Sequence, residues 1–220
     1  MNGNELLPPL WLSLKVSVTA SLLVAIIGII VAHFMARRSF RGKSVVETAF
    51  MLPLVLPPTV VGFILLVALG RRSWIGKSYE WLFNQPIVFS WTAAVIAAVI
   101  VAFPLVYQSM KVGFLTIDKS LLESARSAGA SERQVMRYIT LPLAKHSLLT
   151  AFVLGFARCL GEFGATLMIA GNIPGKTQTV PTAIYVAVDS GHTAMAWAWT
   201  ISIVLFSFLL LSFTGRKMEQ

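Results

Sequence analysis

Apolar residues gather along the chain in five long windows that are separated by shorter polar stretches. A membrane-spanning helix needs about 20 mostly apolar residues, because the hydrocarbon core is about 30 Å thick and each helical residue rises about 1.5 Å. The pattern therefore predicts an all-α, polytopic membrane protein with about five spanning helices, at residues 10–36, 49–69, 90–110, 147–170 and 194–214. The stretches between them are too short for a separate soluble domain, so residues 1–220 are expected to form a single transmembrane domain.

The composition favours a membrane protein over the soluble classes. Hydrophobic residues make up 56% of the 220 positions and charged residues 12%, whereas soluble domains average about 45–50% and about 25%. The net charge of +9 first suggests nucleic acid, but such binding needs basic residues on a soluble face. A single cysteine excludes a disulfide framework. We predict no metal site, because no histidine or cysteine has a second ligand at metal-binding spacing.

The basic residues predict how the chain is oriented in the membrane. Twelve of the 18 Lys and Arg residues fall in one set of alternating segments, which includes the 111–146 loop and the C-terminus. The other set holds four, Arg71, Arg72, Lys77 and Lys176. By the positive-inside rule, a multi-pass protein of the cell (inner) membrane is expected, with its N-terminus outside and its C-terminus in the cytoplasm.

The 111–146 loop carries two helix-start signals in succession. Ser120 with Glu123, and Ser131 with Gln134, both fit a capping box, in which two side chains satisfy backbone groups at the start of a helix. Gly129 lies between them and suits the left-handed position that ends a helix. Pro142 is expected to stop the second helix. The loop therefore reads as helix, tight turn, helix.

Both loop helices are amphipathic, with Leu121 and Leu122 on the first and Val135 and Met136 on the second. Their apolar faces could pack on the membrane helices of the same chain, or dock into a groove on a partner protein. The residues alone leave both alternatives open.

One run of residues in this loop resembles the EAA motif of ABC importer permeases. That motif reads E-A-A, three residues, G, nine residues, I-x-L-P, and the spacing is met in full with Ser124 in place of one alanine. The matching residues are Glu123, Ser124, Ala125, Gly129, Ile139, Leu141 and Pro142. The resemblance implies a type I importer fold in which this loop inserts into a cytoplasmic ATPase subunit, and it favours docking.

Other segments are similar to molybdate permeases. They are the proline-rich run 52–62, Gly70-Arg-Arg, the run Arg158-x-x-Gly-Glu162-Phe-Gly-Ala-Thr166, and Asn172-Ile-Pro-Gly175. Tungstate and sulfate permeases are close relatives and stay as alternative substrates. The resemblance implies a homodimer, two ATPase subunits, an external or periplasmic molybdate-binding protein, and transport by alternating access.

Two glycine-rich segments come close to a nucleotide-binding loop but fail its spacing. A Walker A loop needs G-x-x-x-x-G-K-[ST], so that its backbone N–H groups wrap the phosphates. Gly171–Thr177 has one residue too few between its glycines, and Gly70–Ser78 has one too many. We therefore expect no cofactor in this chain and no catalytic residues, and ATP and Mg in a partner ATPase.

Two groups are candidates for the translocation path. Arg158 and Glu162 stand one helical turn apart within the fourth window, where an ionisable group costs about 2.5–3.5 kcal/mol. They could simply neutralise each other, or Arg158 could face a cavity and help an oxyanion across with Glu162 restraining it. Prolines 53, 57 and 58 should bend the second span, either as a static kink or as part of a gate lined by Pro57, Pro58 and Thr59.

The outer segment 171–193 offers Asn172, Lys176 and Thr177 as candidates to meet an anion at a helix start. The alternative is a plain turn that helps to dock an external binding protein. A rival of a different class is a gradient-driven secondary transporter, which would usually show internal repeats with matching broken helices. We see no second copy of the proline-rich span.

Overall fold

The computed structural model describes residues 3–218, and every regular element in that range is helical. Three helices are long: α1 (Gly3–Arg37), α5 (Trp91–Leu115) and α12 (Thr193–Met218). The intermediate ones are α2 (Lys43–Val55), α3 (Pro58–Leu69), α4 (Trp74–Phe83), α9 (Lys145–Leu160) and α11 (Val180–Asp189). The short ones are α6 (Lys119–Ser127), α7 (Glu132–Val135), the π segment η1 (Met136–Thr140), α8 (Leu141–Leu143) and α10 (Gly164–Ala170).

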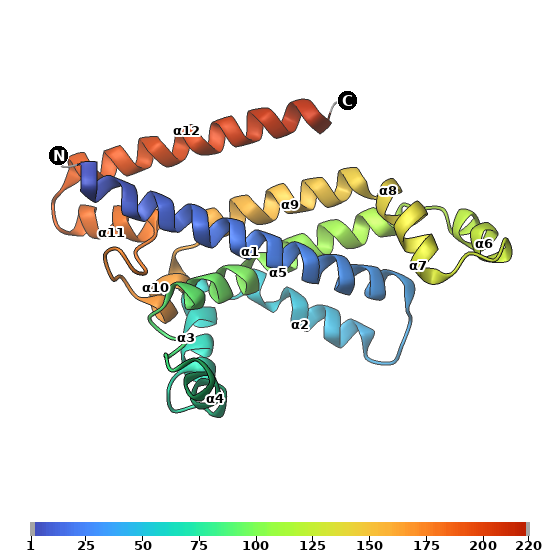
Figure 1. The fold of residues 1–220 in the computed structure, drawn as a ribbon, viewed down its shortest axis with the longest axis horizontal. Helices are drawn as coiled ribbons and strands as arrows, with labels where there is room; N and C mark the ends of the chain where they lie inside the picture. Colours follow the sequence, from blue (N-terminus) through green and yellow to red (C-terminus); the bar gives the residue numbers. More distant parts are fainter. Residues whose placement is uncertain (1–2, 219–220) are drawn as a thin grey trace.

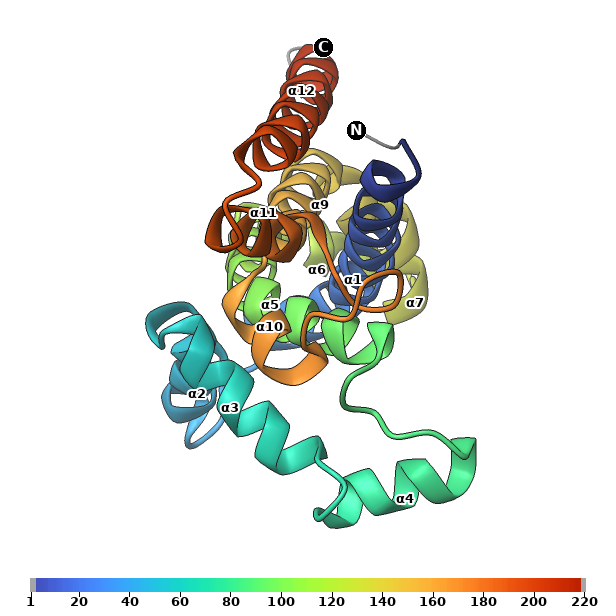
Figure 2. The same ribbon diagram turned by 90° about the vertical axis from the view of Figure 1, so that its left-hand side faces the viewer.

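The helices α1, α2, α5, α9 and α12 run along the long axis of the molecule, and α1 and α12 both begin near the same end of it (Figure 1). The segment from α6 to α8, called here the α6–α8 loop, lies at the end toward which α12 runs. A view along the long axis shows α1, α5 and α9 together in the bundle, with α12 on its outside and α3 and α4 reaching away from it (Figure 2).

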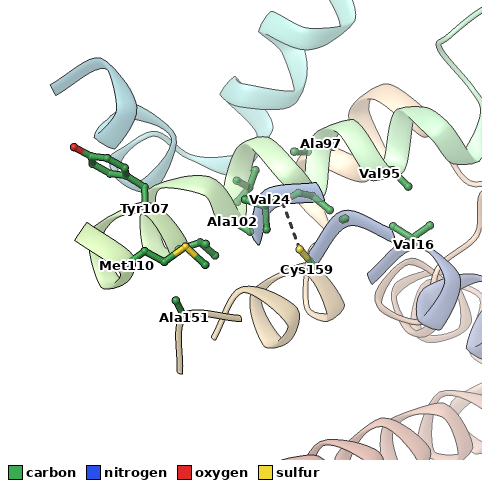
Figure 3. Close-up of a cluster of buried hydrophobic side chains, with 14 of the residues drawn as sticks. Val16, Val24, Val95, Ala97, Ala102, Tyr107, Met110, Ala151 and Cys159 are labelled. Carbon is green, nitrogen blue, oxygen red and sulfur yellow. Dashed lines mark hydrogen bonds between the residues drawn. The ribbon is translucent and has the colours of Figure 1, made fainter. Parts of the chain in front are cut away.

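Small side chains let the bundle helices approach closely. Alanines 93, 94, 97 and 98 of α5 and serines 13, 17 and 21 of α1 are all buried, as expected where membrane helices pack. A Cβ added at Gly155 of α9 would lie 2.5 Å from Val106 Cγ2 of α5. Figure 3 shows the centre of this packing, with Val24, Ala97 and Ala102 among its buried side chains. Here Cys159 Sγ donates to the Ala98 carbonyl at 3.7 Å.

Three helices, α1, α5 and α12, are long and apolar enough to cross a membrane by themselves. They cover the predicted windows 10–36, 90–110 and 194–214. Two further bent pairs bring the number of candidate spans to as many as five, so the prediction of an all-α protein with about five spans is confirmed.

The other two windows are not continuous helices. In window 49–69 the predicted bend is present, but it is a break: α2 and α3 meet at 112° across Leu56 and Pro57. Window 147–170 is interrupted at residues 161–163, because α9 ends at Leu160 and α10 begins at Gly164. With its 13 residues, α2 is about 20 Å long, which is too short to cross the hydrocarbon core alone.

Candidate functional site

The N-cap of the first helix in the α6–α8 loop lies two residues before the one that the sequence predicted. Asp118 is the N-cap, and its Oδ1 accepts a hydrogen bond from the Ser120 amide at 2.9 Å. Ser120 therefore lies inside the helix, so the prediction of a Ser120–Glu123 capping box is wrong. An aspartate is an equally strong cap, and its position two residues earlier allows Lys119 to start the helix. The Ser120 amide also holds the pKa of Asp118 below its usual value.

The second helix begins as predicted. The Ser131 hydroxyl accepts from the Gln134 amide at 3.4 Å, and Gln134 Oε1 accepts from the Ser131 amide at 2.8 Å. This is a complete capping box. Gly129 has a φ of 88°, in the left-handed region that glycine adopts without strain. The tight turn between the two helices is confirmed.

Pro142 does not stop the second helix. The helical backbone continues through it to Leu143 and turns by 71° into α9 only at Ala144. The preceding π segment makes this possible, since its wider turn pairs the Leu141 amide with the Met136 carbonyl and adjusts the backbone where Pro142 can donate no hydrogen bond.

The α6–α8 loop packs on its own chain by one side and leaves most of the motif outside. Leu122 and Val135 are buried, at 7% and 1% exposure. Of the EAA-like residues, Glu123, Ser124, Gly129 and Pro142 are exposed, while Ala125, Ile139 and Leu141 are partly buried. A groove of about 320 Å³ lies across the turn, lined by residues 128–130, Gln134, Val135, Tyr138 and Ile139. Leu122, Val135, Ala125 and Ile139 therefore pack on the core of their own chain, as the intramolecular alternative predicts, and an open surface remains for a partner.

Polar contacts fasten this loop to the end of α1. Arg37 Nη2 donates to Thr140 Oγ1 at 2.7 Å, and Thr140 is fully buried. Glu132 lies 3.9 Å from Arg37 and accepts two hydrogen bonds from Arg126. The Arg126 guanidinium holds the pKa of the Glu132 carboxyl below its usual range. Sequence reasoning did not foresee these contacts, because Arg37 and Thr140 are far apart in the chain.

The two helix breaks meet in space. A Cβ added at Gly62 of α3 would lie 2.7 Å from Met168 Cβ and 2.8 Å from Ala165 Cα of α10. One added at Gly164 would lie 3.0 Å from Pro58 Cβ. The start of α3 therefore packs directly against the start of α10, and we call this contact the α3–α10 crossing.

Arg158 and Glu162 form an ion pair beside this crossing. Arg158 Nη1 lies 2.7 Å from Glu162 Oε2, and the side chains are 30% and 2% exposed. The sequence predicted Arg158 and Glu162 on one helix, but Glu162 lies in the break that follows α9. Its other oxygen, Oε1, accepts from the Ala165 amide at 2.9 Å, so one carboxylate joins the end of α9 to the first turn of α10.

The structure thus brings most of the predicted path residues to one place. The ion pair is joined to the crossing by the hydrogen bond from the Ala165 amide to Glu162. The neighbouring Gly164 approaches Pro58 and the Thr59 amide. Prolines 57 and 58 and Thr59 are exposed on the single chain. Pro57, Pro58 and Thr59 would therefore line a space for an anion that lay beside the crossing.

The outer candidates lie in the separate turn between α10 and α11. Thr177 is fully buried, and its hydroxyl accepts from the Ile173 amide at 2.9 Å. The amides of residues 176–178 donate to the Ile173 carbonyl, so these groups are used within the turn. Lys176 is exposed, and Asn172 Oδ1 is buried without a hydrogen-bond partner. Thr177 has the geometry of the plain turn, and Lys176 presents its charge to solvent, whereas the Asn172 carbonyl oxygen is enclosed.

Further polar residues hold the bundle helices together. Glu47 of α2 lies 2.6 Å from Lys111 of α5 and accepts from the Tyr107 hydroxyl at 3.3 Å. Lys15 of α1 lies over the ring of Trp91, 3.9 Å from its centroid. Among the described residues no cluster of three or more metal-ligating side chains is found.

Comparison with known proteins gives consistent matches along the chain. A family model described as "Binding-protein-dependent transport system inner membrane component" matches residues 25–216. The chain is 55% identical over 217 residues, 99% of this chain and 96% of the relative, to YvgM of Bacillus subtilis, which is provisionally named a molybdenum transport system permease protein. It is 42% identical over 214 residues, 95% of this chain and 93% of the relative, to the molybdenum transport system permease protein ModB of Haemophilus influenzae.

A solved structure shares the fold. A chain of a bacterial ABC transporter that imports the acidic polysaccharide alginate superposes with a TM-score of 0.79 at 15% identity, covering 99% of this chain and 80% of that one.

Proposed function

This chain belongs to the family of binding-protein-dependent transport system inner membrane components, and we propose that the anion it carries across the membrane is molybdate. It is a multi-pass transport subunit of an ABC importer, not an enzyme. The identity of 55% over 99% of the chain to a relative named for molybdenum transport is the observation that carries the choice of substrate. Tungstate and sulfate are the competing oxyanions.

The partners follow from the surfaces that the fold leaves open. The exposed EAA-like residues around Glu123 and Gly129 would dock into a cytoplasmic ATPase subunit, which binds ATP and Mg and hydrolyses the nucleotide. Helix α12 carries apolar side chains that its own chain hardly covers, with 11% of its most apolar window buried. Such a surface suits a second copy of the chain within the membrane, and the working unit is then a homodimer with two ATPase subunits.

The outer end would receive the anion from an external binding protein. The turn after α10 presents Lys176 to solvent, whereas the unpaired carbonyl oxygen of Asn172 is buried. These features suit a docking surface for that protein more than a deep anion site, because Thr177 and the neighbouring amides already bond within the turn.

Transport would proceed by alternating access around the α3–α10 crossing. Closure of the ATPase dimer moves the α6–α8 loop, and the loop passes the movement to α1 through Arg37 and to α9 through the turn at Ala144. The helices then open on the outer side. Arg158 would meet the anion, while Glu162 screens the guanidinium, so that the anion is held weakly and can leave.

A proline substitution tests the gate. Pro58→Ala should lower uptake and change the ATP used per anion, because Pro58 contacts Gly164 at the crossing. Pro53→Ala, near the C-terminal end of α2, serves as the matched control. If Pro58→Ala left both quantities unchanged, the gate assignment would be lost and a static kink would remain.

Uptake of labelled molybdate tests the substrate. The complete transporter, reconstituted in vesicles with its binding protein and ATPase, should take up molybdate in preference to sulfate, with tungstate as the stronger competitor. A preference for sulfate would contradict the substrate while leaving the family assignment intact.

A further inference from the structure

Helices α3 and α4 form an arm that stands away from the bundle. Figure 2 looks along the long axis and shows both helices running across that axis, with α4 farthest from the bundle. Trp74 and Trp81 of α4 are 77% and 83% exposed. Leu82 and Phe83 are also mostly exposed, at 64% and 54%. The arm therefore presents large apolar side chains that the described part of this chain does not cover.

The direction of α4 is fixed by local contacts. Ser73 caps the helix by accepting from the Gly76 amide at 2.9 Å and donates to the Gly70 carbonyl at 2.9 Å. A Cβ at Gly76 would lie 2.1 Å from the Gly70 oxygen, so only glycine allows this close turn. Arg71 pairs with Glu80 at 3.3 Å. The elbow between α3 and α4 is thus a built feature and holds the exposed face of α4 in one orientation.

Helix α4 lies at a level along the long axis where the side chains of the bundle are typical of a membrane boundary. The first turn of α5 carries Trp91, over which Lys15 of α1 lies, and tryptophan and a snorkelling lysine mark the interface between lipid and water. Figure 1 shows α4 at the same level along the axis as this end of α5. Since the candidate spanning helices run along the axis and α4 runs across it, a membrane with its boundary at this level would have α4 parallel to its plane, on the side that the charge pattern predicts to be outer.

The exposed face of α4 combines aromatic and basic side chains. Trp74, Lys77, Ser78 and Trp81 recur at helical spacing and share one face, and all four are exposed. Arg72, just before the helix, is exposed as well. Tryptophans beside cations are typical of helices that lie in a headgroup layer and attract anionic lipids.

We propose that α4 is an interfacial anchor, which places Trp74 and Trp81 in the outer headgroup layer and binds anionic phospholipid through Lys77 and Arg72. The anchor holds the outer end of α3, and through α3 it steadies one side of the α3–α10 crossing. It is independent of which anion is carried, so its test does not depend on the substrate.

Spin-label depth measurements test the anchor. The full-length chain with Cys159→Ser is reconstituted in vesicles of phosphatidylcholine and phosphatidylglycerol, and a label is attached at Trp81→Cys. Ser127→Cys in α6 gives the aqueous reference, and Ile26→Cys, at a 58% exposed position within the candidate span of α1, gives the hydrocarbon reference. The ratio of collisions with oxygen to collisions with a water-soluble nickel chelate should fall between the two references. A ratio equal to either reference, or protection from both reagents, would overturn the proposal, the last by showing that a protein covers α4.

Two further experiments test separately whether α4 binds anionic lipid and whether the external binding protein covers α4. Omitting phosphatidylglycerol should make the label at residue 81 more mobile, and Arg72→Gln with Lys77→Gln should abolish that lipid dependence. No dependence on phosphatidylglycerol would refute binding of anionic lipid. Adding the purified external binding protein should leave the label accessible, whereas protection by it would reassign the face to that protein.

Discussion

The α3–α10 crossing and the α6–α8 loop are both interruptions in the helical pattern, but they are attached to the bundle by opposite means. At the crossing, glycines bring backbone against backbone. The Glu162 side chain, which pairs with Arg158 there, is only 2% exposed. The loop is joined to α1 through side chains, and the carboxylate in that network, Glu132, is 67% exposed.

This difference separates a fixed region from an adjustable one. Close backbone packing has few alternatives, since interiors tolerate little change in volume, whereas exposed ion pairs are worth about 0–1 kcal/mol and exchange partners readily. A fixed crossing suits a point about which helices turn, and an adjustable loop suits a surface that must follow a moving ATPase. Changes at the crossing should therefore cost more than changes in the loop.

The largest effect is expected for Gly62→Ala. The new Cβ would meet Ala165 Cα at 2.8 Å, so backbone must move, at a cost of about 1–3 kcal/mol. The midpoint of thermal unfolding in detergent measures the loss. Gly161→Ala is the control, because its Cβ would meet only the Ala157 oxygen at 3.7 Å and should change the midpoint little. Equal effects of both substitutions would show that the crossing is not tightly packed.

A smaller loss is expected for Glu162→Gln. The amide retains an oxygen for the Ala165 amide but leaves the Arg158 guanidinium without its counter-charge. Because Arg158 is 30% exposed, water replaces part of the lost interaction, and the cost is about 1 kcal/mol. Adding Arg158→Gln should restore part of the stability, and the double-mutant cycle isolates the pair. Additive losses would mean that the two side chains do not interact as described.

In the loop, Thr140→Val should lower stability by about 1 kcal/mol, because Arg37 loses a buried hydrogen-bond acceptor. It should also lower the uptake obtained per ATP, since the contact with α1 is weakened. Thr48→Val removes an exposed hydroxyl that bonds only the Ser44 carbonyl of its own helix and serves as the matched control. Unchanged coupling in Thr140→Val would remove Arg37 from the route of transmission.

The smallest effect is a dependence of loop order on pH. Arg126 lowers the folded-state pKa of Glu132, so the stabilisation is present above the ordinary glutamate pKa of about 4.3 and is lost as the pH falls through the lowered value. The mobility of a spin label at Ser127→Cys, with Cys159→Ser, should therefore stay constant at neutral pH and rise in acid.

Glu132→Gln isolates the contribution of this carboxyl. Asp118 also has a lowered pKa and titrates in the same direction, so some acid response should remain in the variant. A response identical to that of the parent chain would assign the whole effect to Asp118.

The sequence pattern predicted the continuous helices well and the breaks poorly, for a physical reason. Windows 10–36 and 90–110 fall on α1 and α5 because hydropathy summed over about 20 residues reports burial in lipid. The same sum does not register the break at residues 161–163, which contains no proline. The local signal of this break is Glu162, three residues before Ala165, whose amide it caps. Hydropathy counts Glu162 only as one charged residue in an apolar run, so the sum does not register the cap.

Candidate residues were recovered where local chemistry decides, and missed where distant contacts decide. The Ser131–Gln134 capping box and the turn at Gly129 follow from nearby backbone groups. Asp118 displaced Ser120 as the first cap because two suitable residues compete within one turn. The contact between Arg37 and Thr140, and the meeting of Pro58 with Gly164, depend on how helices pack, and no spacing along the chain encodes them.

The most direct test of the central claim is uptake of molybdate into vesicles that hold this chain together with its ATPase subunit and external binding protein. Uptake should require ATP on the side of the membrane where the ATPase subunit lies. It should stop when the binding protein is left out. Glu123→Ala, in the exposed part of the EAA-like run, should retain the folded chain but lose association with the ATPase. Molybdate uptake that persists without ATP, by a chain that binds no ATPase subunit, would contradict the account.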